Sequence, residues 1–282
     1  MPADRQTEPI PAPAMAASNP MRLLIDFGQG DPLTLRLKLP LGPVSVGDLL
    51  WAVFAVADAI HKRTALDLAA MGKTIGCGPG CSRCCHQLVP VSDHEAAHLA
   101  GLVRAMPEPL RRRVISRFAL ATNTLDQAGL ITPLTGHFST GASDAAAFRD
   151  LARRYWRLGI PCPFLEKDCC LVHPNRPMAC RQYLVTSPPE LCAALHTPEQ
   201  NHELVLHPVD AGGALAAFSG EGLRHSRVLP LTFSLLAERA IRSEPALTLP
   251  APVMLGRFLT LMTDCFTRRD PPLPGSDISM RD

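Results

Sequence analysis

Hydrophobic positions along this chain recur mostly at intervals of three and four residues, the spacing of an amphipathic helix. One such run predicts a helix over residues 46–71, capped by Ser45 and ended by Gly72. A second helix is expected to begin at Ser92, because Glu95 three residues later completes a capping-box pattern. Further helices are predicted over residues 107–125, 143–158, 231–241 and 253–266.

Two stretches near the beginning of the chain are partly β-branched or alternate apolar and polar residues. Residues 22–27 and 33–39 flank a Gly-containing turn and predict a small N-terminal β-hairpin. Residues 129–141 are rich in Thr, Gly and Ser, which indicates a loop. Residues 1–20 and 271–282 are expected to be disordered tails. The predicted fold class is therefore mainly α, with an irregular cysteine-rich centre that a metal would organise.

Between the two tails the sequence predicts a single domain over residues 21–270. Its metal core is expected at residues 76–192, where the cysteines lie, and its C-terminal helices at residues 230–267. We find no internal repeat in the chain. Helical elements would thus surround a centre that no sheet holds together.

Composition and charge limit the classes of protein that fit. The chain has 282 residues, 46% of them hydrophobic, and a net charge of +2, which is typical of a globular protein and unlike a polyelectrolyte that coats nucleic acid. The first twenty residues contain no apolar run, so we expect no signal peptide. The longest apolar window is too short for a membrane span. We therefore expect a cytoplasmic protein, in which thiols stay reduced.

Nine of the ten cysteines gather in two short clusters. The first cluster reads Cys-Gly-Pro-Gly-Cys-Ser-Arg-Cys-Cys-His over residues 77–86, and the second spans residues 162–192. Thiolates two to four residues apart can surround one ion, because a tight turn lets their sulfurs face a common point. We expect the two clusters to join in space. The candidate ligands are Cys77, Cys81, Cys84, Cys85, Cys162, Cys170 and Cys180, with Cys169, Cys192 and His173 as additional candidates.

The adjacent cysteines at residues 84–85 and 169–170 indicate more than one simple zinc knuckle. Neighbouring side chains point in divergent directions, so each pair fits two metals, or an iron–sulfur cluster and its surroundings. Arginines within the clusters are expected to donate hydrogen bonds to metal-bound sulfurs, namely Arg83, Arg176 and Arg181. The tenth cysteine, Cys265, stands alone on an apolar helix and is expected to be a core residue.

The same segments resemble the YkgJ-type cysteine-cluster family, which is described as zinc- or iron-chelating. The family is marked by CxxCxxCC, CPFL and RPxxCR, and this chain shows CSRCC, CPFL and RPMACR at residues 81–85, 162–165 and 176–181. The resemblance covers residues 76–183 and implies zinc or an iron–sulfur cluster as the cofactor. Three residues, not two, separate the first two cysteines here, and His173 replaces the family's usual Tyr, which makes His173 a candidate ligand.

A second pattern, His-Glu-Ala-Ala-His at residues 94–98, matches the HExxH signature of zinc peptidases. The position of the third ligand in the longer metzincin pattern holds Arg104, and Glu95 is already explained as the capping partner of Ser92. We therefore expect no peptidase activity, and a thermally mild Glu95→Gln change, because Gln also serves in a capping box. One histidine near the first cluster could instead complete its metal site, the candidates being His86, His94 and His98.

The sequence thus predicts a cytoplasmic protein that binds zinc or an iron–sulfur cluster through two cysteine clusters, with no membrane contact. The alternative is an iron–sulfur enzyme, because the cysteine pattern is also similar to that of flagellin lysine-N-methylase; a redox enzyme belongs to the same alternative. A zinc module that binds nucleic acid ranks lower. Residues 153–157 mix Arg with Tyr and Trp, but we expect one aromatic ring to pack inward on a helix and the arginines to be solvated.

Overall fold

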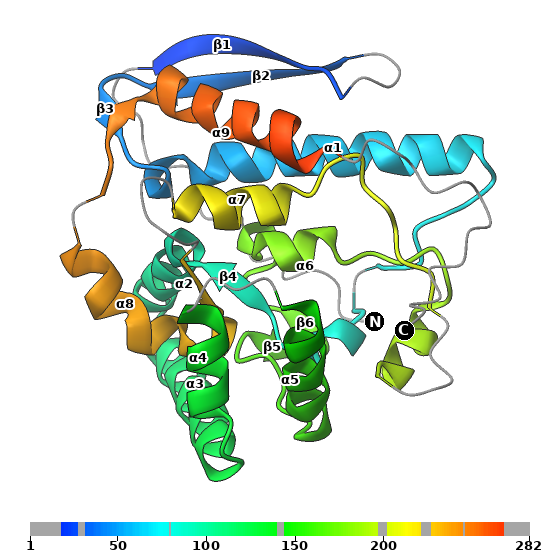
Figure 1. Cartoon of the computed structure of the whole chain (residues 1–282), viewed down its shortest axis with the longest axis vertical. Coiled ribbons are helices and arrows are strands. Elements are labelled where there is room, and N and C mark those ends of the chain that lie inside the picture. The colour runs from blue at the N-terminus through cyan, green and yellow to red at the C-terminus, as the bar shows by residue number, and fades with distance from the viewer. Residues whose placement is uncertain are drawn as a thin grey trace.

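The computed structural model describes residues 18–27, 32–78, 80–139, 144–196, 202–220, 227–244 and 246–267. The structure is mainly helical with a small antiparallel hairpin near its beginning, which confirms the predicted fold class (Figure 1). The α-helices are α1 (Leu50–Ala70), α2 (Asp93–Ala105), α3 (Glu108–Gln127), α4 (Ile131–Ser139), α5 (Ala145–Arg157), α6 (Met178–Gln182), α7 (Ala211–Ser219), α8 (Ser234–Ser243) and α9 (Ala251–Phe266). The short 3-10 helices are η1 (Gly47–Leu49), η2 (Arg83–His86), η3 (His173–Asn175), η4 (Pro189–Ala194) and η5 (Leu231–Phe233).

The strands form four separate antiparallel pairs. Each pair is two-stranded, so no continuous sheet organises the described part of the chain. The pairs are β1 (Ser18–Ile25) with β2 (Leu33–Pro40), β3 (Pro43–Val44) with β8 (Leu249–Pro250), β4 (Pro90–Ser92) with β7 (Val228–Pro230), and β5 (Leu165–Glu166) with β6 (Cys169–Cys170).

The β1–β2 hairpin covers one end of the molecule (Figure 1). Leu23 lies opposite Leu35, and alternate residues such as Ile25 and Leu39 are buried, because successive side chains of a strand point to opposite faces. The buried face packs against α1, α7 and α9 in one hydrophobic cluster, which we call the hairpin layer. β1 begins at Ser18, so the strand includes the last residues that we assigned to the tail. Residues 1–17 and 271–282 lie outside the described residues.

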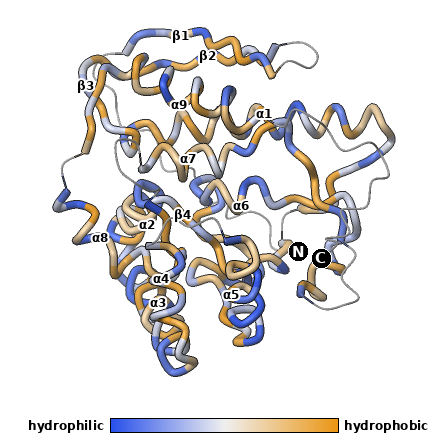
Figure 2. The backbone as a smooth tube through the Cα atoms, viewed as in Figure 1, coloured by the Kyte–Doolittle hydropathy of each residue, from blue (hydrophilic) through white to orange (hydrophobic). Residues whose placement is uncertain are grey.

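The other long helices form a second part of the fold. Residues of α2, α3 and α8 share one apolar cluster, and residues of α3, α4 and α5 share another. Figure 2 shows hydrophobic residues gathered along α7 and α9, and more hydrophilic ones along α3 and α5. Tyr155 of α5 is buried, which confirms that one aromatic ring of that helix packs inward. None of the described helices combines the length and apolar character needed to cross a membrane.

Helix boundaries follow local capping where the sequence signal was strong. Ser92 caps α2, and both hydrogen bonds of its capping box with Glu95 are present, as predicted. The expected loop over residues 129–141 is wrong, because Ile131 and Leu134 recur at helical spacing and belong to α4. Pro133 is tolerated there because it lies in the first turn, where its missing N–H has no helical partner.

Two further features differ from expectation near the end of the chain. The sequence pattern did not predict α7, whose first turn contains two glycines that lower helix propensity; Asp210 caps this helix through the Gly213 N–H. Cys265 is exposed, so its assignment to the core is wrong. The buried face of α9 runs through Phe258 and Met262, four residues apart, and Cys265 follows in the last turn of the helix, where its side chain is exposed.

Candidate metal centre

The backbone brings the two cysteine clusters together. The N–H of Cys162 donates to the carbonyl oxygen of Cys85 at 2.6 Å, which joins the first residue of the second cluster to the first cluster. The N–H of Gly76 donates to the carbonyl oxygen of Val185 at 2.8 Å, and η2 packs against η4. The expectation that the clusters join in space is confirmed for their backbones.

Gly76 permits the closest of these approaches. A Cβ atom on this residue would lie 2.5 Å from the carbonyl oxygen of Ser187, closer than non-bonded atoms allow. Only glycine lets the irregular segment before Cys77 reach the segment that leads to Cys192. Gly80, with φ of +83°, then provides the left-handed turn between Cys77 and Cys81.

Each cysteine-bearing segment is anchored by an apolar neighbour in a different hydrophobic cluster. Leu88, just after the first cluster, packs with α3, α4 and α5, and Phe164 packs with α2 and α3. Met178, two residues before Cys180, belongs to the hairpin layer. The centre therefore lies where the three apolar clusters meet, and α6 lies between the hairpin layer and the β5–β6 hairpin (Figure 1).

The β5–β6 hairpin separates the adjacent cysteines of the second cluster. Cys170 pairs with Leu165 and is half-buried, whereas Cys169 pairs with Glu166 and is exposed. Successive side chains of a strand point to opposite faces, so only one of the two thiols faces the interior. The turn residue Asp168 accepts a hydrogen bond from Ser82 Oγ at 2.6 Å, which fastens this hairpin to the first cluster.

The short helix α6 positions Cys180. Its first N–H, from Met178, donates to Glu95 Oε1 at 2.6 Å, while Glu95 Oε2 accepts from the N–H and Oγ of Ser92, both at 2.8 Å. The buried Glu95 carboxylate thus caps two helices, α2 and α6, at once. This contact extends the role that we assigned to Glu95 from the sequence.

Arg181 does not donate hydrogen bonds to cysteine sulfurs as we expected, because its donors bind oxygen atoms. Its side chain is 3% exposed, and its donors bind the Arg176 carbonyl oxygen at 2.9 Å, the Pro174 carbonyl oxygen and the Asp58 carboxylate. The guanidinium carbon also lies 4.3 Å from the centre of the Phe54 ring. Arg181 therefore fixes the loop before Cys180, and Arg83 is exposed.

Burial keeps most of the central thiols protonated. It raises the pKa of Cys162 to about 12, and it raises the pKa of Cys180 well above the ordinary thiol value. The adjacent pair behaves differently: Cys85 donates a hydrogen bond to Cys84, which raises the pKa of Cys85 and lowers that of Cys84. Cys84 is therefore the thiol of this pair that loses its proton first.

A buried donor beside these thiols fits a metal-bound thiolate centre. Arg176 Nε is buried and has no hydrogen-bond acceptor among the described residues, whereas the Gln87 side chain bonds that of Tyr183. The Arg176 charge lowers the pKa of the Cys84 thiol, and it acts in the same direction on Cys170 and Cys180 against the larger effect of burial. Anionic sulfur is the acceptor that this donor lacks, and arginine is suited to supply charge-assisted hydrogen bonds to it.

The remaining candidate ligands lie as follows. Cys77, Cys81, Cys84, Cys85, Cys162, Cys170 and Cys180 are half-buried, Cys192 is buried, and Cys169 is exposed; all ten cysteines are free of disulfides. His173 is exposed, and its Nε2 lies 2.8 Å from Nη1 of Arg176. Within the described ranges, no three Cys, His, Asp or Glu side chains lie close enough together to hold an ion.

The HEAAH segment has a structural explanation. Both Glu95 oxygens are occupied by helix caps, His98 Nε2 lies 3.2 Å from Asn175 Oδ1, and His94 lies beside Asp93 at 3.7 Å. Burial is the main cause that raises the pKa of Glu95 and lowers that of His98. The geometry gives no water-activating role to Glu95.

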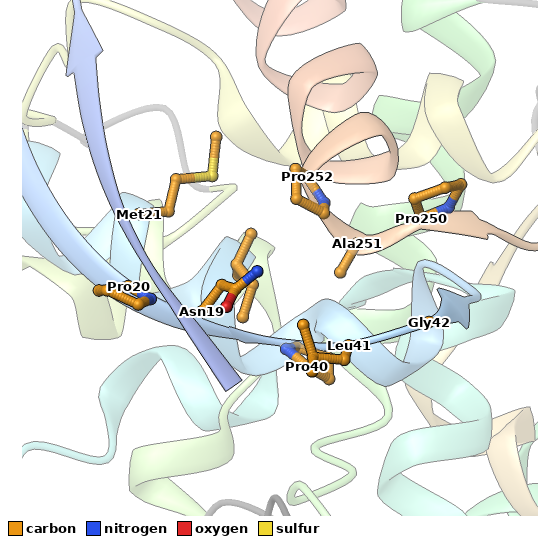
Figure 3. Close-up of a pocket in the computed structure, with 10 residues that line it drawn as sticks. Asn19, Pro20, Met21, Pro40, Leu41, Gly42, Pro250, Ala251 and Pro252 are labelled. Carbon is orange, nitrogen blue, oxygen red and sulfur yellow. The ribbon is translucent and has the colours of Figure 1, made fainter. Parts of the chain in front are cut away.

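Two cavities lie away from the two cysteine clusters. A pocket of about 420 Å³ lies at the open end of the hairpin, and Figure 3 shows that prolines such as Pro20, Pro40 and Pro252 line it. A second cavity, of about 690 Å³, lies between α7 and α9 and includes Cys265, Arg257 and Asp264. Neither contains a residue of the two clusters, so both are separate from the candidate centre.

Comparison with known proteins supports the metal-binding interpretation. Residues 76–203 match the family model CxxCxxCC, described as a "Putative zinc- or iron-chelating domain". The match confirms the resemblance inferred from the sequence and extends past residue 183 to include Cys192. No curated protein and no solved structure matches the chain.

Proposed function

We propose that the chain binds zinc or an iron–sulfur cluster through thiolates of both clusters, and that this centre has a structural or sensory role in the cytoplasm. The observation that carries the proposal is the convergence of the two clusters beside the buried Arg176 Nε, which has no acceptor among the described residues. The proposed ligands are Cys77, Cys81, Cys84, Cys85, Cys162, Cys170, Cys180 and Cys192.

The exposed position of Cys169 leaves it outside the proposed set, and the contact of His173 with Arg176 disfavours the histidine as a ligand. A bound metal would supply positive charge that converts buried neutral thiols to thiolates. The residues of this chain hold the cysteine-bearing segments in place: Glu95 fixes the start of α6, and Arg181 fixes the loop before it. The buried Arg176 Nε, which has no acceptor among the described residues, would donate to a thiolate sulfur.

Metal analysis of the full chain, purified without oxygen, tests this proposal. We expect stoichiometric zinc or iron in the protein, with Cys265→Ser as a control that keeps it, because the exposed Cys265 belongs to neither cluster. Colourless protein with zinc would favour a structural centre, whereas iron with sulfide and broad visible absorption would favour an iron–sulfur centre. Protein that takes up neither metal after reduction and reconstitution would overturn the proposal.

A further inference from the structure

One face of helix α5 is rich in arginine and lies outside the proposed ligand set. Leu151 and Tyr155 are buried on the inner side of this helix, in the apolar cluster that α5 shares with α3 and α4. Arg149, Arg153 and Arg157 are exposed on another side, and Figure 2 shows hydrophilic residues along the helix. The three arginines recur every four residues, so they share one helix face over a rise of about 12 Å. We call this surface the arginine face.

The arginine face lacks acidic partners. No salt bridge joins its three arginines to another described residue, whereas the arginines of α3 pair with Glu108 or Glu166. Like charges four residues apart on a helix repel each other. The helix dipole favours a cation in the last turn, which accounts for Arg157 but not for Arg149 in the second turn. The surface therefore keeps positive charge that an anionic partner would neutralise.

An aromatic ring lies on the same surface. Trp156 follows Arg149 by seven residues and Arg153 by three, so it shares their side of the helix. Trp156 is half-buried, whereas its neighbour Tyr155 is buried. The Trp156 ring lies edge to face with the ring of His196, which follows η4, and the two ring centres are 6.2 Å apart. Burial lowers the pKa of His196, and the positive charge of Arg153 lowers it further, which places that arginine near the same pair of rings.

We propose that the arginine face of α5 binds single-stranded nucleic acid, with its arginines on phosphates and Trp156 stacked on a base. Proteins that bind single strands combine cationic side chains along the backbone with aromatic rings that stack on the bases. From the sequence we expected these arginines only to be solvated. The shared face of Trp156 and three arginines without salt bridges changes that expectation.

Other anionic partners fit this surface less well. A duplex keeps its bases stacked on each other, so it would use the arginines but not the ring. An acidic peptide would also leave the ring unused. The exposed large hydrophobic residues of the described chain all lie outside α5, which disfavours a lipid surface. Only a single strand uses both the charge and the ring of this face.

Binding of fluorescein-labelled oligouridine and oligothymidine to the full-length protein tests the proposal. Fluorescence anisotropy at salt concentrations from about 50 to 200 mM should show binding that weakens with salt, because each phosphate contact adds about 0.7 to the slope of log K against log salt. Arg153→Gln should weaken binding and lower that slope by about 0.7. The matched control is Arg112→Gln, which changes an exposed arginine of α3 that pairs with Glu108, and it should leave both quantities unchanged.

The indole ring gives a second measurement. Trp156→Ala should weaken binding by about five- to hundredfold, the range expected for one stacked base. A stacked base should also quench the fluorescence of Trp156 in the wild type. Trp51→Phe removes the other tryptophan of the chain, which packs in the hairpin layer, and should keep the quenching.

Three outcomes would overturn the proposal. The first is a folded wild type that binds neither strand at about 50 mM salt. The second is a duplex or an oligoglutamate peptide that binds as tightly as the single strands and leaves the Trp156 fluorescence unchanged. The third is an equal loss of binding in Arg153→Gln and Arg112→Gln. Zinc and iron are measured in each preparation, so failure here is distinguished from failure of the metal-binding proposal, on which this inference does not depend.

Discussion

The hairpin layer and the cysteine-rich centre are held together in different ways. In the hairpin layer, two eight-residue strands and three helices bury a continuous apolar cluster. In the centre, the elements that bear cysteines are two to six residues long. Their segments are fixed by single contacts such as Glu95 to Met178 and Ser82 to Asp168. Strand pairing and hydrophobic burial therefore explain the order of the hairpin layer, whereas the cysteine-rich centre needs an added source of order.

Metal removal should show this difference most strongly. Structural zinc binding is worth about 10–16 kcal/mol in small zinc domains, and that free energy stabilises the fold. We expect chelation to lower the melting temperature by more than about 10 °C and to expose residues 161–192 to proteolysis. The hairpin layer should stay protected from hydrogen exchange. An unchanged melting curve after verified metal loss would contradict this expectation.

A substitution that creates a cavity in the hairpin layer should lower the stability of the fold without changing the metal content. Phe258 is fully buried and packs edge to face on Phe218. Phe258→Ala should cost about 3–5 kcal/mol of unfolding free energy, because it removes apolar contacts and leaves a cavity. The metal content should not change, since no thiol packs in that cluster. Urea denaturation of one preparation measures the loss of unfolding free energy, and metal analysis of the same preparation measures its metal content. A loss of metal would show that the two regions are coupled.

Glu95→Gln probes the junction between the two regions. The sequence alone led us to expect a mild effect, but the second contact of Glu95 changes that expectation. A glutamine has one acceptor oxygen, so either the Ser92 N–H or the Met178 N–H would lose its partner in a buried position. An unsatisfied buried donor costs about 1–3 kcal/mol.

A matched control for this change exists on the surface. Glu108 also lies in a first helical turn, but its side chain is 48% exposed, so Glu108→Gln should stay within about 0.5 kcal/mol of the wild type. Denaturant midpoints of the two variants provide the comparison. Equal midpoints would show that the contact of Glu95 with α6 contributes nothing.

The smallest expected effect is a pH dependence on the α1 side of the centre. Burial, followed by the charge of the neighbouring His207, lowers the pKa of His61 from 6.5 to about 3. The folded state thus rejects a proton that the unfolded chain accepts below pH 6.5. The contribution of neutral His61 to stability is complete above that pH and is lost as pH falls toward 3. After allowance for solvent screening we expect about 1 kcal/mol between pH 6.5 and 5.

His61→Gln should flatten this acid dependence. Unfolding midpoints of the wild type and the variant, measured from pH 7 to 5 with the same metal loading, give the comparison. Parallel curves for the two proteins would mean that His61 has no such role.

Local signals in the sequence predicted the parts of the fold that local interactions determine. The Ser92 capping box and the hairpin strands are examples, because each depends on residues close in the chain. The helix α4 was missed because its Thr and Gly content hid the apolar spacing of Ile131 and Leu134. Cys169 is exposed because it lies in a short hairpin whose turn residues, Lys167 and Asp168, have positive φ angles. The sequence pattern did not predict this turn.

Contacts between distant segments could not be predicted in the same way. The approach of Gly76 to Ser187 and the cap that Glu95 gives to α6 join residues more than eighty positions apart, and one sequence holds no signal for either. The cysteines that we propose as metal ligands were visible from composition and spacing alone. The ligand set, the limits of the domain and the roles of the two tails remain predictions.

The double cap of Glu95 also bears on how short motifs are interpreted. A capping box places a glutamate at the third position of a helix, three residues after the capping serine. When a histidine stands directly before that glutamate and another stands three positions after it, the sequence matches HExxH by chance. In a peptidase that glutamate must be free to meet water, whereas here both of its oxygens are occupied. The same motif is therefore compatible with a carboxylate that is free to bind water and with one that is fully hydrogen-bonded. The residue three positions before the glutamate helps to distinguish the two cases.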